Sequence, residues 1–191
     1  MRILILTASV LALAACSQPA EAPAPADAPA ATDAAQPASF DASAGGLLEA
    51  DGLTPAQPGG GTALKIPFGW TEAQVTEFLN GFWGREPERG ECADLGLTTL
   101  TYGADLDLLF EGGRFAGYFA GEDAPETFST IGEIHVGSTL AEIRAASPEV
   151  QVTEGSVGPE FGVGEVFGFL SGTGDDARVT GLYAGRACIF R

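Results

Sequence analysis

Basic side chains, histidine and cysteine are all scarce in this chain of 191 residues. Nine lysines and arginines stand against 26 aspartates and glutamates, which gives a formal net charge of −17. Because phosphate groups are neutralised by clustered Lys and Arg, this balance argues against binding of nucleic acid or of an anionic membrane through a basic face. The single histidine, His135, excludes any site that needs two imidazoles, and three cysteines exclude a cysteine-rich zinc module. We therefore expect neither a metal nor a cofactor.

A long hydrophobic run is also missing. The apolar stretch at residues 3–13 is shorter than the roughly 20 residues that a membrane-spanning helix needs. With Arg2 before it and small residues after it, this stretch is typical of a secretory signal peptide, which we place at residues 1–15.

The boundary of the signal peptide reads Leu13-Ala14-Ala15-Cys16, which resembles the bacterial lipobox, with cleavage before Cys16. The resemblance implies that Cys16 is acylated and that the chain is anchored to a membrane, since two or more acyl chains anchor stably. Ser17 follows the cysteine in place of Asp, which by resemblance to enterobacterial sorting implies the outer membrane. The alternative is an ordinary signal peptide with a chance cysteine.

Residues 16–44 are mostly Ala and Pro. Proline removes backbone donors and stops helix propagation, and Ala buries too little area to offset chain entropy. The composition predicts a disordered tether that leads to a folded α+β domain at residues 45–191.

Two blocks of the domain recur in the same order. Residues 68–75 match residues 136–143 at an offset of 68, and residues 113–121 match residues 177–185 at an offset of 64. The two matches favour an internal duplication. We place repeat one at about 62–121 and repeat two at about 132–191.

Each first block contains a capping box that predicts a helix. Thr71 with Gln74, and Thr139 with Glu142, have the spacing of this motif. In it, the Thr hydroxyl accepts a hydrogen bond from the backbone amide three residues later, and the Gln or Glu side chain accepts one from the Thr amide. Pro148 predicts the end of the second helix.

Short apolar or alternating segments after each helix predict antiparallel hairpins. We expect strands at residues 47–53, 63–68, 97–102, 106–110, 114–120, 163–170 and 178–183. Within residues 114–120, strict alternation puts Phe115 and Phe119 on one face and Tyr118 on the other. The prediction is an α+β fold: two tandem helix-then-hairpin repeats that form a sheet with short helices on one face.

Residues 66–75 and 134–143 resemble the opening of a repeat found in the small lipoprotein subunit of the outer-membrane β-barrel assembly machine and, in tandem, in secreted β-lactamase inhibitor proteins. The pattern is apolar-x-apolar-Gly-x-Thr, with hairpins after it. Glu91-Cys92 and the closing Cys188-x-Phe190-Arg191 also resemble uncharacterised proteobacterial lipoproteins. The resemblance implies a fold; no functional residue is carried over from it.

Two cysteines remain once Cys16 is assigned to lipid. Cys92 and Cys188 form an even pair in an oxidising compartment, which predicts a disulfide. The alternative is a reactive thiol.

Three features have both a chemical and a structural interpretation. Asp105 and Asp107 lie two apart on a predicted strand, so they either act as an acid–base pair or mark a solvated face. Residues 172–176 either touch Ca²⁺ or form a hairpin turn. His135 beside an apolar strand is either catalytic or structural.

Aromatic side chains are the most informative surplus. A sheet covered by helices on one side leaves its other face free. Trp and Tyr dominate interface energetics, so we expect Trp70, Trp83, Tyr118 and Tyr183 to be candidate contacts for a protein partner in the envelope. The leading hypothesis is a non-enzymatic binding or scaffold lipoprotein. The alternatives are a periplasmic carrier or enzyme with an acidic cleft, and a structural lipoprotein without a dedicated partner.

Overall fold

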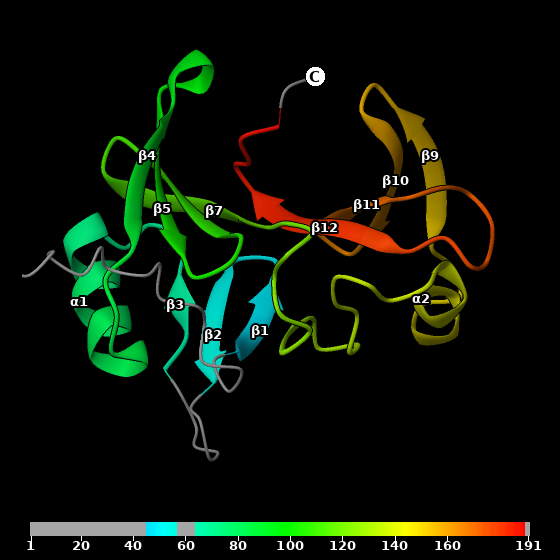
Figure 1. Cartoon of the computed structure of the whole chain (residues 1–191), viewed down its shortest axis with the longest axis horizontal. Coiled ribbons are helices and arrows are strands. Elements are labelled where there is room, and N and C mark those ends of the chain that lie inside the picture. The colour runs from blue at the N-terminus through cyan, green and yellow to red at the C-terminus, as the bar shows by residue number, and fades with distance from the viewer. Residues whose placement is uncertain (1–44, 57–63, 190–191) are drawn as a thin grey trace, which may run out of the picture. The chain divides into compact units, whose positions relative to one another are not determined.

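The computed structural model describes residues 45–56 and 64–189 (Figure 1). All of them belong to one unit that runs from Pro37 to Arg191. The predicted signal peptide, the lipidation site Cys16 and the tether lie outside the described residues.

The described chain is mostly β, with two α-helices and two sheets. The strands are β1 Gly45–Glu49, β2 Gly52–Ala56, β3 Ile66–Pro67, β4 Glu88–Cys92, β5 Leu97–Tyr102, β6 Leu106–Glu111, β7 Arg114–Ala120, β8 Phe128–Ser129, β9 Gln151–Gly155, β10 Gly158–Val163, β11 Val166–Leu170 and β12 Val179–Gly185. The helices are α1 Glu72–Trp83, the short 3₁₀ helix η1 Ala93–Leu95, and α2 Leu140–Ala146.

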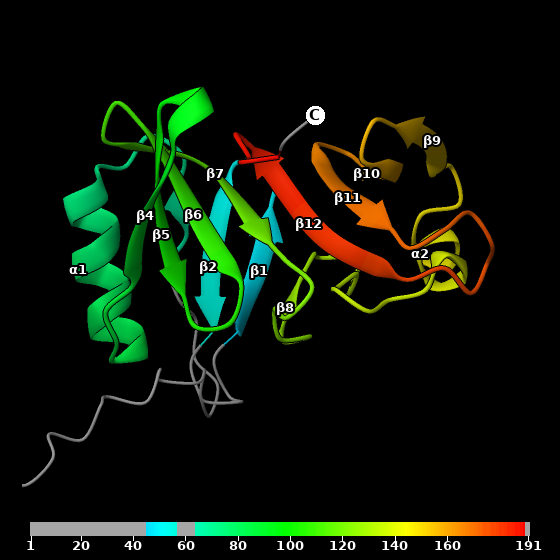
Figure 2. The same cartoon turned by 45° about the horizontal axis from the view of Figure 1, so that its top comes forward.

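The larger sheet has eight strands in the order β4-β5-β6-β7-β12-β11-β10-β9, and every neighbouring pair is antiparallel. Strands β7 and β12 join its two halves through the pairing of Ala120 with Leu182 and of Gly117 with Gly185 (Figure 2). Each half therefore continues the hydrogen bonding of the other.

The smaller sheet has the order β3-β2-β1-β8, in which β1 and β8 are parallel. The single strand predicted at residues 47–53 is wrong, because a turn at Ala50-Asp51 divides this segment into β1 and β2. Gly52 allows the close approach of β3: a Cβ there would lie 2.2 Å from the carbonyl oxygen of Ile66.

One hydrophobic core joins both sheets and both helices. Its members include Leu53 from the small sheet, Leu108 from the large sheet, Leu79 from α1 and Ile143 from α2. The helices and the small sheet therefore pack on one side of the large sheet, as Figure 1 shows. We call this side the inner face and the opposite side the outer face.

Both predicted capping boxes are confirmed. The hydroxyls of Thr71 and Thr139 accept hydrogen bonds from the backbone amides of Gln74 and Glu142, whose side chains accept from the threonine amides in return. Helix α1 is capped at its C-terminus by Gly84 in the left-handed conformation, and the amide of Gly84 donates to the carbonyl of Asn80.

The two Gly-x-Thr turns make equivalent backbone contacts with the sheet. The amide of Gly69 donates to the carbonyl of Phe115 at 2.7 Å, and that of Gly137 donates to the carbonyl of Val179 at 2.8 Å. The guanidinium groups of Arg114 and Arg178 donate back to the carbonyls of Gly69 and Gly137, at 2.9 and 2.8 Å.

Two further expectations about strands are wrong. The segment 163–170 is divided by a turn at Gly164, whose φ of +63° suits glycine, so β10 ends and β11 begins there. In β7 the register shifts at Ala116, between the pairs Leu109–Gly117 and Phe110–Phe115. This bulge breaks the alternation, so that Phe115 points to the inner face together with Tyr118 rather than sharing a face with Phe119.

Candidate functional site

The outer face is crossed by the C-terminal segment, which a disulfide holds. Cys92 at the end of β4 is bonded to Cys188, with their Cα atoms 5.9 Å apart, so the predicted disulfide is confirmed. We call residues 186–189 the strap.

Two glycines, Gly185 and Gly117, allow the strap to lie close to β7. Gly185 ends β12 with φ +65°, and the amide of Arg186 then donates to the carbonyl of Ala116 at 2.9 Å. A Cβ on Gly117 would lie 2.0 Å from the carbonyl oxygen of Arg186, so only glycine fits beneath this crossing.

A second, smaller hydrophobic cluster lies under the strap. It consists of Cys92, Leu97 and Leu109, with Phe119 and Cys188 packed against it. The strap therefore covers apolar side chains of β5, β6 and β7 on the outer face.

Beyond the strap, the outer face carries what we call the aromatic group: Phe119, Phe167, Phe169 and Tyr183. Cross-strand pairing places Tyr183 between Phe119 on β7 and Phe167 on β11. The Tyr183 ring stacks on Phe167 and on Phe169, with centroids 5.6 and 5.4 Å apart. Phe167 is 41% exposed, whereas Tyr183 is only 7% exposed. The accessible part of the aromatic group is thus centred on Phe167.

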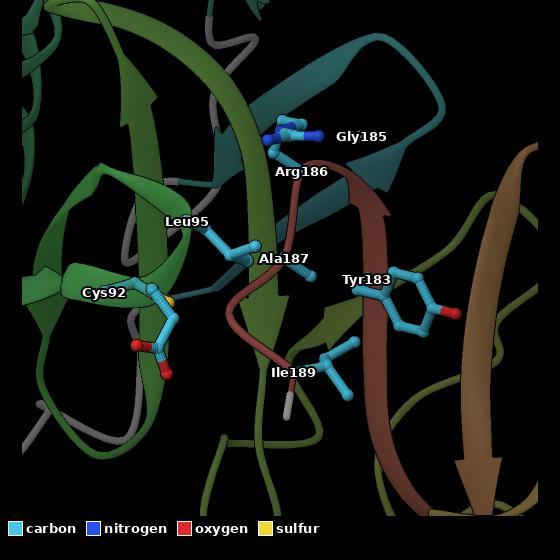
Figure 3. Close-up of a pocket in the computed structure, with 8 residues that line it drawn as sticks. Cys92, Leu95, Tyr183, Gly185, Arg186, Ala187 and Ile189 are labelled. Atoms are coloured by element: carbon cyan, nitrogen blue, oxygen red, sulfur yellow. The ribbon is translucent and has the colours of Figure 1, made fainter. Parts of the chain in front are cut away.

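A pocket of about 480 Å³ opens between the strap, η1 and Tyr183 (Figure 3). Leu95, itself 43% exposed, points from η1 toward the strap, whereas the Tyr183 ring leans away from it. Asp94 lines the pocket as well. The disulfide fixes one wall of this pocket relative to the sheet.

Charge on the outer face is mainly negative. Asp107 lies directly opposite Phe119, and its carboxylate accepts a hydrogen bond of 2.5 Å from the Thr101 hydroxyl. Burial raises the pKa of Asp107, although the Thr101 hydrogen bond acts in the opposite direction. The guanidinium of Arg186 is paired with Glu111 at 3.2 Å.

The structure corrects the predicted contact residues. Tyr118 lies opposite Leu108 on the inner face and is fully buried, so the prediction that it contacts a partner is wrong. Tyr183 lies on the outer face, but it is largely covered. It supports the rings of Phe167 and Phe169, on which it stacks.

The two tryptophans lie around α1 rather than on the outer face. Trp83 packs edge-on against the core rings of Tyr102 and Phe128, with centroids 5.3 and 5.8 Å away. Trp70 is half-buried and contacts Phe78 edge-on at 6.1 Å. The ring contacts described for the two tryptophans are therefore with residues outside the aromatic group.

The expectation that Asp105 and Asp107 lie on one strand is wrong, because β6 begins after Asp105. Asp105 lies in the turn before β6 with φ +69°, where its carboxylate accepts from the amide of Asp123 at 3.3 Å. This hydrogen bond gives Asp105 a structural role in the turn, while Asp107 alone lies on β6.

His135 lines a second pocket of about 620 Å³ together with Glu126, Glu133 and Glu142. Its Nδ1 lies 2.8 Å from the carbonyl oxygen of Val136, and its backbone amide donates to Ser138. Hydrogen bonds from Thr139 lower the pKa of Glu142, which therefore serves the helix cap as a carboxylate. This arrangement favours the structural interpretation of His135.

The segment at residues 172–176 forms the connection between β11 and β12, where the amide of Ala177 donates to the carbonyl of Gly174. Over residues 45–56 and 64–189, no group of three or more His, Cys, Asp or Glu side chains could hold a metal ion. Within the same ranges, no helix has the length and apolarity needed to cross a membrane.

No family model, curated protein or solved structure matches this chain. The outer face must therefore be interpreted from its own geometry and chemistry.

Sequence reasoning missed Phe119, Phe167 and Phe169 as surface residues. Alternation along β11 was the available signal, since Phe167 and Phe169 flank Gly168 and so share a face. The aromatic candidates chosen from the sequence were Trp and Tyr alone, so these phenylalanines were left out.

Tyr118→Phe is expected to raise the free energy of unfolding by about 1 kcal/mol. The Tyr118 hydroxyl is buried without a hydrogen-bond partner among the described residues, and an unpartnered buried hydroxyl is destabilising. Urea unfolding measures the change. Tyr102→Phe is the matched control: Tyr102 is equally buried, but its hydroxyl lies 3.2 Å from the Asn80 side-chain amide, so its loss should cost about 1 kcal/mol. Equal changes in both variants would contradict this account.

Proposed function

We propose that this protein is a non-enzymatic binding module of the bacterial envelope, which engages a protein partner through the aromatic group and the adjacent pocket. The observation that carries the proposal is the solvent-exposed ring of Phe167, stacked on Tyr183. Aromatic side chains in such a setting bury a large area on binding while losing little conformational freedom, because their neighbours already hold them.

The fixed geometry of the site supports this proposal. The disulfide and the hydrogen bond from Arg186 to Ala116 hold the strap, which forms one wall of the pocket. A partner would therefore meet a largely preformed surface, and binding would require little reordering.

We further propose that the domain is built from two copies of one helix-then-hairpin unit. The equivalent hydrogen bonds of Gly69 and Gly137, and of Arg114 and Arg178, support this view. The tandem arrangement agrees with the resemblance to the assembly-machine lipoprotein and to β-lactamase inhibitor proteins. Pairing of β7 with β12 makes one sheet from the two units and gives a wider outer face than either unit would have.

In-cell photocrosslinking tests the binding function. A benzoylphenylalanine placed at position 167 is expected to capture a protein in the cells that make this chain. The control position is Ile131, which is 77% exposed but lies in the segment between β8 and α2. Capture from both positions alike, or none from position 167, would overturn the proposal.

The envelope location depends on Cys16 and has its own test. Cys16→Ser is expected to move the protein from the membrane fraction to the soluble fraction, since acyl chains supply the anchoring free energy. Immunoblotting of the two fractions measures the shift, with Cys188→Ser as the control that leaves the anchor intact. Continued membrane association of the Cys16→Ser variant would refute lipid anchoring through this residue.

A further inference from the structure

The outer face is acidic around its aromatic group. Asp94 lines the pocket and Asp107 lies beside Phe119, while the nearby Arg186 is already paired with Glu111. The other basic side chains with described partners are held elsewhere, by acidic residues or by glycine carbonyls: Lys65, Arg89, Arg114, Arg144 and Arg178. The surface thus offers carboxylates and aromatic rings but no spare cation among these residues.

The spacing of these groups follows from the sheet register. Asp107, Phe119, Tyr183 and Phe167 are cross-strand neighbours on β6, β7, β12 and β11. Adjacent strands lie about 4.8 Å apart, so roughly 14 Å separates Asp107 from Phe167 along the row. An extended segment rises about 3.3 Å per residue, and two of its residues four positions apart span about 13 Å.

We propose that the outer face binds an extended protein segment that carries an Arg or Lys side chain four positions from an aromatic or large aliphatic one. The apolar side chain packs on Phe167 beside Tyr183, and the cation pairs with Asp107. This inference rests on the proposed function and specifies its partner by chemistry.

The environment of Asp107 supports the assignment of the cation. Its carboxylate is half-buried and has one described side-chain donor, Thr101. Partial burial disfavours the charged form of this carboxyl group in the free protein. A partner cation would favour the charged form, so the interaction gained on binding offsets a cost already present in the unbound state.

The test uses a phage-displayed library of random twelve-residue peptides, panned on the full chain and counter-selected on its Phe167→Ser variant. Enriched peptides are expected to combine a basic and an apolar residue four positions apart. Fluorescence anisotropy with the synthetic peptides should show about tenfold weaker binding to Asp107→Asn. Glu149→Gln, an equal loss of charge at an exposed position after α2, should leave the affinity unchanged.

Folding of the variant is checked by thermal unfolding, in which Asp107→Asn should be no less stable than the unsubstituted chain, since burial disfavours its carboxylate. Enriched peptides without a basic residue, or equal effects of Asp107→Asn and Glu149→Gln, would overturn the inference while leaving the binding function in place. If no peptide distinguishes the chain from its Phe167→Ser variant, this inference fails and photocrosslinking at position 167 alone decides the binding function.

Discussion

Replacing Cys92 and Cys188 together with serine is expected to lower the free energy of unfolding by about 3 kcal/mol. The disulfide joins residues 96 apart in the sequence, and a closed loop of this length restricts the unfolded chain strongly. The chain-entropy description gives an upper value of about 4.7 kcal/mol, and measured values for removed disulfides are commonly about 2–5 kcal/mol. Urea unfolding under oxidising conditions measures the loss.

The same variant should release the strap. Among the described residues, the contacts that would then remain are the Arg186 hydrogen bond to Ala116, its exposed ion pair with Glu111 and the packing on the small cluster beneath the strap. Exposed ion pairs contribute little, so trypsin should cleave after Arg186 much faster than in the disulfide-bonded chain. Cys188→Ser alone should behave like the double variant, because either substitution removes the bond. An unchanged cleavage rate would show that other contacts hold the strap.

Gly117→Val is expected to destabilise the disulfide-bonded protein by about 3 kcal/mol. Its Cβ would meet the backbone of Arg186 at 2.0 Å, and backbone cannot rotate out of the way as a flexible side chain can. The loss should be smaller, about 2 kcal/mol, in the variant without the disulfide, because the strap can then move. It should not vanish, because the same Cβ would also lie 2.7 Å from the carbonyl oxygen of Ala184 in β12. A double-mutant cycle by urea unfolding measures this coupling.

Gly81→Ala provides the control for the Gly117 experiment. Gly81 lies in α1, and a Cβ there would meet nothing within 4 Å. This substitution should stabilise the chain by about 0.5–1 kcal/mol through helix propensity, in both disulfide states alike. Equal losses for Gly117→Val with and without the disulfide would mean that the strap does not lie against β7 as described.

Local sequence signals predicted the elements that local physics fixes. The capping boxes at Thr71 and Thr139 depend on side chains three residues apart, and both helices begin where these predict. Strand β5 and strand β7 also have the predicted bounds, since glycine-containing turns flank their alternating apolar positions. Strands β4 (Glu88–Cys92) and β9 (Gln151–Gly155) were missed because their sequences are largely polar. Both lie at the edges of the large sheet.

The candidate site was harder to predict, because small irregularities decide which side of a sheet a residue faces. Sequence alternation alone put Phe115 with Phe119, and the bulge at Ala116 separated them. The turn at Gly164 set the phase of β11 and thereby placed Phe167 and Phe169 on the outer face. Each effect involves one or two residues but reverses the faces of a whole segment.

The sequence by itself determined the helix starts, the main hairpins, the acidic character and the pairing of Cys92 with Cys188, because each depends on short spacing, on composition or on a count of cysteines. Only the tertiary structure decided that Tyr118 is buried, that the strap crosses β7 at Gly117, and that Phe167 is the exposed aromatic residue. These features depend on strand register and on contacts between segments far apart in the chain. Register is selected by packing of the whole core, which no local pattern contains.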